Sequence, residues 1–273
     1  MIHALNPSYF LKTVSLEKLL PLLKKHGFTH VDYSPASRKE DCLALAEKDR
    51  ALLDANGITV EQSHAPYNRY GQHGTVAEYR VHLDRCVEAC AVLGAKYLVV
   101  HGDEFENDTM TYTPEAAADY NYELFAPVVE RAAKYGYGVA FETVFQDWDR
   151  PRHCAKFEEL YGLITRFNTP IVTCCWDTGH AGVAFGDDQP EMIRRMGSLI
   201  TCTHIHDCGH KQDLHQVPFH GDIDWASTMK AFGDIGYKGA LTYELVYGTI
   251  PEALTDPTLA LLKDTADLLE SYR

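Results

Sequence analysis

The sequence predicts a single α/β domain, residues 1–273, folded as a closed (β/α)₈ barrel of the TIM type. Eight short apolar runs alternate with amphipathic helical segments, which is the pattern of parallel βαβ units. Nothing that resembles a linker or a low-complexity segment separates these units. An open doubly wound sheet is the main alternative, but that fold would usually carry a glycine-rich phosphate loop after its first strand, where this chain has Asn6-Pro7-Ser8.

Local signals justify each element in turn. Ser15 is a favoured helix N-cap with leucines following on one face, and Gly27 closes that helix. Pro114 stands where a proline starts a helix. The strands are expected at 2–6, 30–34, 58–63, 97–100, 138–141, 171–176, 199–205 and 239–243. The helices are expected at 15–27, 39–55, 76–93, 114–135, 157–167, 191–196, 225–235 and around 259–269.

Composition restricts the classes of partner. Hydrophobic residues make up 45% of the chain, enough for a full core, and 25 Lys and Arg against 39 Asp and Glu give a net charge of −14. Such a charge repels a phosphate backbone at long range, so nucleic acid is not expected as a partner. Bound divalent cations would cancel part of the negative charge.

The cysteines and the apolar runs indicate a cytoplasmic protein. Eight cysteines form no C-x-x-C motif and several lie in apolar runs, which suits buried thiols in a reducing compartment better than disulfides. The sequence shows no charged-then-apolar leader and no apolar run of membrane-spanning length. We therefore expect a cytoplasmic location and no membrane contact.

Polar side chains end most of the expected strands. In barrels of this type the active site lies at the carboxyl ends of the strands. One histidine at such a position is usually a satisfied polar group, but many ionisable groups at one rim would be destabilising unless a cation held them. Carboxylate and imidazole together suit Zn²⁺, Mn²⁺ or Co²⁺. The strand-end residues, with two from the loop after the seventh strand, are His64, His101, Glu142, Asp177, His180, His206, Glu244, Asp213 and His215.

Several neighbours of these residues are weaker candidates. His204, two positions before His206, is expected to point the other way on its strand and to be structural. Cys208 and His210 lie in the ligand-bearing loop and could reach the site. Aromatic side chains near the rim are either packing residues or an apolar wall for a substrate: Tyr67, Phe145, Trp148 and Trp225.

The motifs together resemble the xylose isomerase-like TIM-barrel superfamily, which joins sugar isomerases and epimerases with endonuclease IV. The resemblance spans essentially the whole chain. The motifs that carry it are His64-Ala-Pro-Tyr67, Val100-His101-Gly102, Phe141-Glu142-Thr143, Trp176-Asp177-Thr178-Gly179-His180, His204-Ile-His206-Asp207, Asp213-Leu-His215 with Gly221-Asp-Ile-Asp-Trp225, and Tyr243-Glu244.

The two branches of this superfamily imply different metal contents. Epimerase-type enzymes hold one divalent ion, and their ligands match Glu142, Asp177, His206 and Glu244. Endonuclease IV holds three zinc ions, and its five further ligands match His64, His101, His180, Asp213 and His215. The resemblance therefore implies a Zn²⁺ or Mn²⁺ cofactor, with one to three ions per chain. It also makes a homodimer a reasonable expectation.

Three functional hypotheses follow. The first is an isomerase or epimerase of a sugar, sugar phosphate or related polyol, with Glu142 and Glu244 as base and acid and with His180, Tyr67 and Trp148 at the substrate. The second is a multinuclear zinc phosphoester hydrolase resembling endonuclease IV, which the full ligand set favours and the net charge opposes. The third is a barrel that keeps its metal for binding or stability. We favour the first, with a small sugar-like molecule as substrate.

Overall fold

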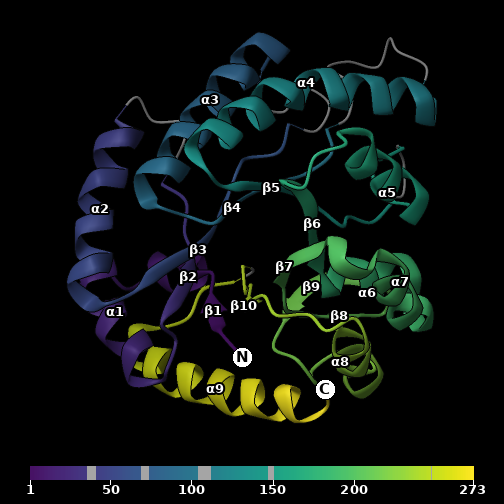
Figure 1. Cartoon of the computed structure of the whole chain (residues 1–273). Helices are drawn as coiled ribbons and strands as arrows, with labels where there is room; N and C mark the ends of the chain where they lie inside the picture. Colours follow the sequence, from purple (N-terminus) through teal and green to yellow (C-terminus); the bar gives the residue numbers. More distant parts are fainter. Residues whose placement is uncertain (36–40, 69–73, 104–111, 147–150, 247) are drawn as a thin grey trace.

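The computed structural model describes residues 1–35, 41–68, 74–103, 112–146, 151–246 and 248–273. Eight parallel strands occupy the centre of the molecule and helices surround them, which confirms the predicted single-domain TIM barrel (Figure 1). The barrel strands are β1 (His3–Leu5), β2 (His30–Asp32), β3 (Thr59–His64), β4 (Tyr97–Val100), β5 (Gly138–Glu142), β6 (Val172–Asp177), β7 (Ile200–His204) and β10 (Leu241–Tyr243).

The barrel closes between β7 and β10. The strands run in the order β10-β1-β2-β3-β4-β5-β6-β7, so the first and last of this series must meet. They do so just beyond β7, where Ile205 pairs with Tyr243 in a parallel bridge. The Ile205 amide donates to the Thr242 carbonyl at 2.7 Å, and the Glu244 amide donates to the Ile205 carbonyl at 3.2 Å. Closure at this point brings the end of β10 beside the end of β7.

The helices begin and end at recognisable caps. Thr75 and Glu78 form a reciprocal capping box at the start of α3, and Gly94 ends that helix in a left-handed conformation. Thr113 caps α4 just before Pro114. The helices are α1 (Leu16–Lys25), α2 (Cys42–Asn56), α3 (Val76–Leu93), α4 (Pro114–Tyr135), α5 (Phe157–Arg166), α6 (Thr178–Phe185), α7 (Gln189–Met196), α8 (Trp225–Asp234) and α9 (Thr255–Ser271), with short 3₁₀ turns at Pro7–Lys12, Gly186–Asp188, Gly197–Leu199 and Glu252–Leu254.

Two elements differ from the sequence-based expectation. The helix after the sixth strand was expected only at 191–196, but α6 already begins directly after Asp177, because the Asp177 carboxylate caps it by accepting from the His180 amide at 2.7 Å. The loop expected after β7 contains an antiparallel hairpin, β8 (Asp207–Gly209) and β9 (Gln212–Gln216). Its strands are short and polar, so they carry no apolar alternation that would have predicted them.

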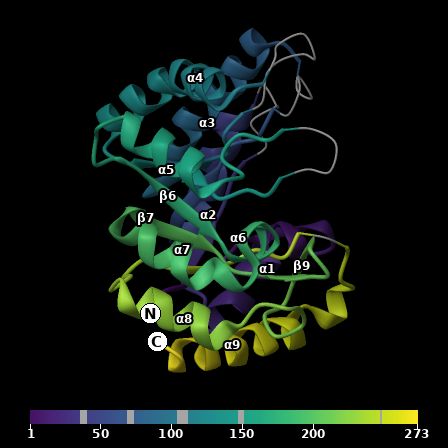
Figure 2. The same cartoon turned by 90° about the vertical axis from the view of Figure 1, so that its right-hand side faces the viewer.

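The core has two parts. The larger part lies between the strands and the helices, and the smaller fills the inside of the barrel with Val99, Ala140, Cys175 and Cys202. All eight cysteines are buried free thiols. Figure 2 shows β9 toward one end of the barrel and the two chain termini toward the other. None of the helices in the described residues is both long and apolar enough to traverse a bilayer.

Candidate metal centre

The strand alternation fixes which side chains enter the barrel. Successive residues of a strand point to opposite faces, so residues two apart share a face. Ala140, Cys175 and Cys202 lie inside the barrel, so the residues two positions later on β5, β6 and β7 also face inward. Those residues are Glu142, Asp177 and His204.

The prediction that His204 points away from the site is wrong. His204 is fully buried inside the barrel, and its Nδ1 atom faces three carboxylates. The distances from Nδ1 are 3.2 Å to Glu142 Oε2, 3.7 Å to Asp177 Oδ2 and 3.5 Å to Glu244 Oε2. The physical reason is the two-residue period of the strand, because His204 and His206 occupy the same face in successive layers.

Asp32, at the end of β2, holds His204 from behind. Asp32 Oδ2 accepts from His204 Nε2 at 3.0 Å and lies 3.5 and 3.4 Å from the amide nitrogens of Asn6 and Gln62. Asn6 also donates to Glu244 Oε1 at 3.1 Å. A carboxylate that binds the far nitrogen of a histidine fixes its tautomer and leaves the near nitrogen free to ligate a metal. Asp32 was not among the sequence-predicted ligands, although it too is an acid at the end of a strand.

Asp177 is placed by the turn between β6 and α6. Its Oδ1 atom caps the helix by accepting from the His180 amide, and its backbone N–H donates to the Thr143 hydroxyl at 2.8 Å. The remaining oxygen, Oδ2, faces His206 Nε2 at 2.9 Å. A side chain at Gly179 would put its Cβ within 2.0 Å of the His206 ring, so only glycine leaves room for this contact.

A second group of ligands lies on the hairpin side of the mouth. One ligand atom from each of His180, His206, Asp213 and His215 lies within 4.8 Å of the others. Asp213 Oδ2 is 3.5 Å from His180 Nε2 and 3.2 Å from His215 Nε2. His215 directs its other nitrogen at the Glu244 backbone carbonyl, 3.2 Å away. The β8–β9 hairpin is therefore the element that brings Asp213 and His215 to the barrel.

The remaining two predicted ligands meet Glu142 from the other side. His64 Nε2 is 2.9 Å and His101 Nε2 is 3.1 Å from Glu142 Oε2. The second nitrogen of His64 lies 2.7 Å from the Ala65 carbonyl. Burial lowers the pKa of His101 to about 4, so this ring is neutral near pH 7. The structure thus brings all nine sequence-predicted ligands together, and adds His204 and Asp32 to them.

Protons on some of the imidazoles balance the negative charge of the carboxylates at the mouth. Burial alone would raise the pKa of Glu142, yet the imidazoles of His101 and His204 lower it well below its usual value. Burial opposes a charge on His204, but the Glu244 and Glu142 carboxylates raise its pKa well above the ordinary value. Burial also opposes a charge on His64, but a hydrogen bond to Glu142 raises its pKa to about 9. A divalent cation would supply the same positive charge and displace these protons.

The donor set fits a divalent cation. His204 Nδ1 and Glu142 Oε1 are buried and make no hydrogen bond within the described residues, although both face oppositely charged groups. A buried polar atom without a hydrogen bond lowers the stability of the fold unless a ligand binds it. Imidazole nitrogens and carboxylate oxygens at this density are the ligands of Zn²⁺ and Mn²⁺. The centre that we define from this fit consists of Glu142, Asp177, His204 and Glu244.

Aromatic side chains line the outer part of the mouth. Tyr67 is 38% exposed and its ring stacks on that of His101, with centroids 5.1 Å apart and planes 4° apart. The Phe145 ring lies 5.4 Å from that of His180. Trp148, the third residue predicted at the substrate, lies outside the described residues. The Tyr67 ring therefore covers His101 at the exposed edge of the ligand cluster.

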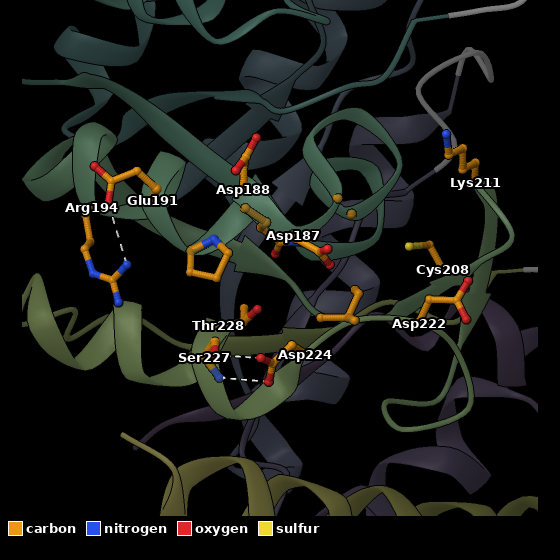
Figure 3. A pocket seen from close by; sticks show the side chains of 15 residues that line it. Asp187, Asp188, Glu191, Arg194, Cys208, Lys211, Asp222, Asp224, Ser227 and Thr228 are labelled. Carbon is orange, nitrogen blue, oxygen red and sulfur yellow. Dashed lines mark hydrogen bonds and ion pairs between the residues drawn. The ribbon is translucent and has the colours of Figure 1, made fainter.

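A separate cavity of about 450 Å³ lies beside the barrel, between α6, α7, the hairpin and the start of α8. Figure 3 shows its lining, which carries acidic and basic side chains but none of the clustered ligands. Cys208, which from its loop could have reached the site, lines this cavity instead, with Sγ directly beside Gly182. Trp225 is also a packing residue, because its indole N–H donates at 2.8 Å to the buried carboxylate of Asp207.

The eight parallel strands and the ligand-bearing carboxyl mouth define the class of protein as a TIM barrel with a candidate metal centre. The chain belongs to the xylose isomerase-like TIM barrel family, whose sequence profile matches residues 20–271. It is 25% identical over 258 residues to the uncharacterized protein y4fM of Sinorhizobium fredii, with 82% of this chain and 79% of that protein covered.

Solved structures share the fold at low sequence identity. A D-tagatose 3-epimerase-like protein superposes with a TM-score of 0.77 at 17% identity, covering 99% of both chains. A D-psicose 3-epimerase in the presence of D-fructose superposes with a TM-score of 0.75 at 17% identity, covering 100% of this chain and 98% of that one. The IolI protein with a bound zinc atom superposes with a TM-score of 0.74 at 18% identity, covering 100% of this chain and 99% of that one. These likenesses show the fold alone.

Proposed function

We propose that this protein is a divalent-metal-dependent isomerase or epimerase of a sugar, sugar phosphate or related polyol. One observation supports this most directly: carboxylates from β5, β6 and β10 converge on the Nδ1 atom of His204 at the carboxyl mouth. Several structural neighbours are named as sugar epimerases, and one carries zinc, which agrees with this function for the shared fold. The proposed ligands are Glu142, Asp177, His204 and Glu244.

The chemistry needs a proton removed from a carbon next to a carbonyl. A bound divalent cation would polarise that carbonyl and the neighbouring hydroxyl, and so make the proton more acidic. Glu142 ends β5 and Glu244 directly follows β10, and β6 and β7 lie between these strands, so the two carboxylates approach a substrate from different sides. Glu142 is ionised, as a base must be, because the histidines around it lower its pKa. Asn6 orients Glu244 by donating to Oε1.

Other residues of the mouth would bind the substrate. His180 directs Nδ1 at the Thr143 carbonyl, 2.9 Å away, which fixes its ring, and Nε2 faces the hairpin. We propose that His180 holds a substrate hydroxyl and that Tyr67 covers one face of the sugar. Stacking of Tyr67 on His101 keeps its ring in place for that contact.

Conservative glutamine variants test the two-carboxylate mechanism. We expect Glu142→Gln and Glu244→Gln each to lower turnover by about 10²- to 10⁴-fold, because each removes a proton-transfer group without changing its size. Turnover of a ketose and ketose-phosphate panel would be measured together with deuterium uptake from solvent into the substrate.

Glu88→Gln is the matched control, because Glu88 is a surface glutamate that pairs with Arg131 on the outer helices. Its turnover should stay at the wild-type level. If Glu142→Gln or Glu244→Gln keeps near-normal turnover and deuterium uptake while folded by circular dichroism, the mechanism is wrong.

A phosphoester hydrolase is the second candidate function. The observation that favours it is the second ligand group, in which His180, Asp213 and His215 lie together beside the first. Two adjacent cations could clamp the attacking and leaving oxygens of a phosphate ester. The net charge of −14 opposes a duplex DNA substrate but not a small phosphorylated metabolite. Metal content per chain by elemental analysis, with assays on abasic-site DNA and sugar phosphates, separates the two functions.

A further inference from the structure

Arg152 is a buried cation that contacts a predicted metal ligand. It lies in the segment between β5 and α5, and its side chain is 5% exposed. A guanidinium nitrogen, NH2, lies 3.3 Å from His101 Nδ1. The guanidinium carbon also stands 5.5 Å from the centre of the Phe145 ring. A buried arginine directed at a histidine of the site calls for an explanation in terms of that site.

The fold brings this arginine to the histidine through a close approach of two segments. Gly102 follows His101, and a Cβ on Gly102 would lie 2.8 Å from Cys154 Sγ and 3.4 Å from the His153 carbonyl. The absence of a side chain at Gly102 therefore lets the 152–154 segment pack against the end of β4. Arg152 reaches His101 because of this contact.

The hydrogen-bonding chemistry of arginine settles the tautomer of His101. A guanidinium has donors only, so His101 Nδ1 must be the acceptor. A neutral imidazole with an accepting Nδ1 carries its proton on Nε2. That Nε2 atom is the one that lies 3.1 Å from Glu142 Oε2. With a proton in place, Nε2 has no lone pair to offer a metal.

The other histidines of the mouth each keep a nitrogen lone pair that a cation can use. His64, His180 and His215 each direct Nδ1 at a backbone carbonyl, at 2.7, 2.9 and 3.2 Å respectively. A carbonyl accepts only, so Nδ1 carries the proton and Nε2 keeps its lone pair for a cation. In His204 the nitrogens are exchanged: Nε2 carries the proton and donates to Asp32, which leaves the Nδ1 lone pair free.

We propose that Arg152 holds His101 as the Nε2–H tautomer, so that its protonated Nε2 faces the Glu142 carboxylate and His101 does not ligate a cation. Arg152 is then a positioning residue, which acts on Glu142 through His101. Cations can be bound by the His204 centre and by the His180, Asp213 and His215 group, but not jointly by His64 and His101. This arrangement opposes the three-zinc ligand set.

The role given to Glu142 rests on the proposed function, but the tautomer does not, so the two can be tested separately. Long-range proton–nitrogen NMR on isotope-labelled protein reports the protonated nitrogen of each histidine, and His101→Gln identifies the signal of His101. We expect a single Nε2–H pattern for His101 in metal-free protein, unchanged after loading with zinc chloride. The His204 signal should shift on the same loading.

Two variants of Arg152 complete the experiment. Arg152→Lys keeps a donor and should preserve the His101 pattern, whereas Arg152→Met removes it and should release the ring to a mixture of tautomers that zinc perturbs. An Nδ1–H pattern in the metal-free wild-type protein would overturn the proposal, as would a zinc-induced change at His101 Nε2. A wild-type pattern in Arg152→Met would show that arginine does not set the tautomer. Turnover of sugars has no part in these outcomes.

Discussion

The two layers of side chains inside the barrel lie two residues apart along the same strands but have opposite chemistry. The lower layer is small, apolar and uncharged, whereas the upper layer contains carboxylates and imidazoles within 4 Å of one another. The lower layer consists of Val99, Ala140, Cys175 and Cys202, and the positions that follow two residues later are His101, Glu142, Asp177 and His204.

The difference shows what a buried charge requires in this barrel. Each charged group of the upper layer has a partner of opposite charge, a helix cap or a carbonyl within reach, and the clustered geometry leaves room for a cation. At these four positions the lower layer has no charged group, whereas two positions before His64 and Glu244 the buried side chains of Gln62 and Thr242 hydrogen-bond each other at 3.1 Å. The lower layer therefore serves as a floor that closes the barrel beneath the charged mouth.

The largest expected effect comes from placing a charge in the floor. Cys202→Asp should lower the free energy of unfolding by about 3–5 kcal/mol, because the new carboxylate is buried without a partner. Cys202→Ala keeps the layer apolar and should cost only about 1 kcal/mol. Urea unfolding followed by circular dichroism measures both. Equal stability of the two variants would mean that the floor already contains compensating groups or water.

The next effect concerns His204 of the upper layer. His204→Ala should weaken zinc binding by more than about 100-fold, since loss of even an outer partner of a metal ligand costs about 10- to 100-fold. His206→Ala is the comparison variant: its Nε2 atom lies 2.9 Å from Asp177 Oδ2, but His206 belongs to the second ligand group, so its loss should cost less zinc affinity. Zinc titration monitored by calorimetry, with thermal unfolding at fixed zinc concentration, measures the effect.

If His206→Ala lowers the affinity for zinc more than His204→Ala does, His206 is the fourth ligand, as the sequence predicted, and our assignment of His204 is wrong.

This pair of histidines also shows what the sequence could and could not predict. The eight strand–helix units follow from periodicity, and the nine candidate ligands follow from strand-end polarity and motif spacing, so the rim was predictable. The orientation of His204 was predictable in principle from the two-residue period, but it was assigned to the wrong face. The roles of Asp32 and Arg152 were not predictable, because each depends on contacts between strands or loops that are far apart in sequence.

The smallest expected effect compares a buried histidine whose ring makes no hydrogen bond with the histidines beside carboxylates. His153 is buried, neither of its ring nitrogens makes a hydrogen bond within the described residues, and burial lowers its pKa to about 4. Between pH 6.5 and 4 the unfolded chain takes up a proton at this residue and the folded chain does not. Its contribution to stability is therefore complete above pH 6.5 and falls as the pH drops toward 4.

His153→Phe should remove this part of the pH dependence. The wild-type free energy of unfolding should fall more steeply than that of the variant from pH 6.5 to 4, by at most about 1.4 kcal/mol per pH unit for one proton. Urea unfolding at a series of pH values, with metal content held constant, gives both slopes. Parallel slopes would show that folded His153 is protonated near its ordinary pKa, and that burial without carboxylates does not keep a histidine neutral in this barrel.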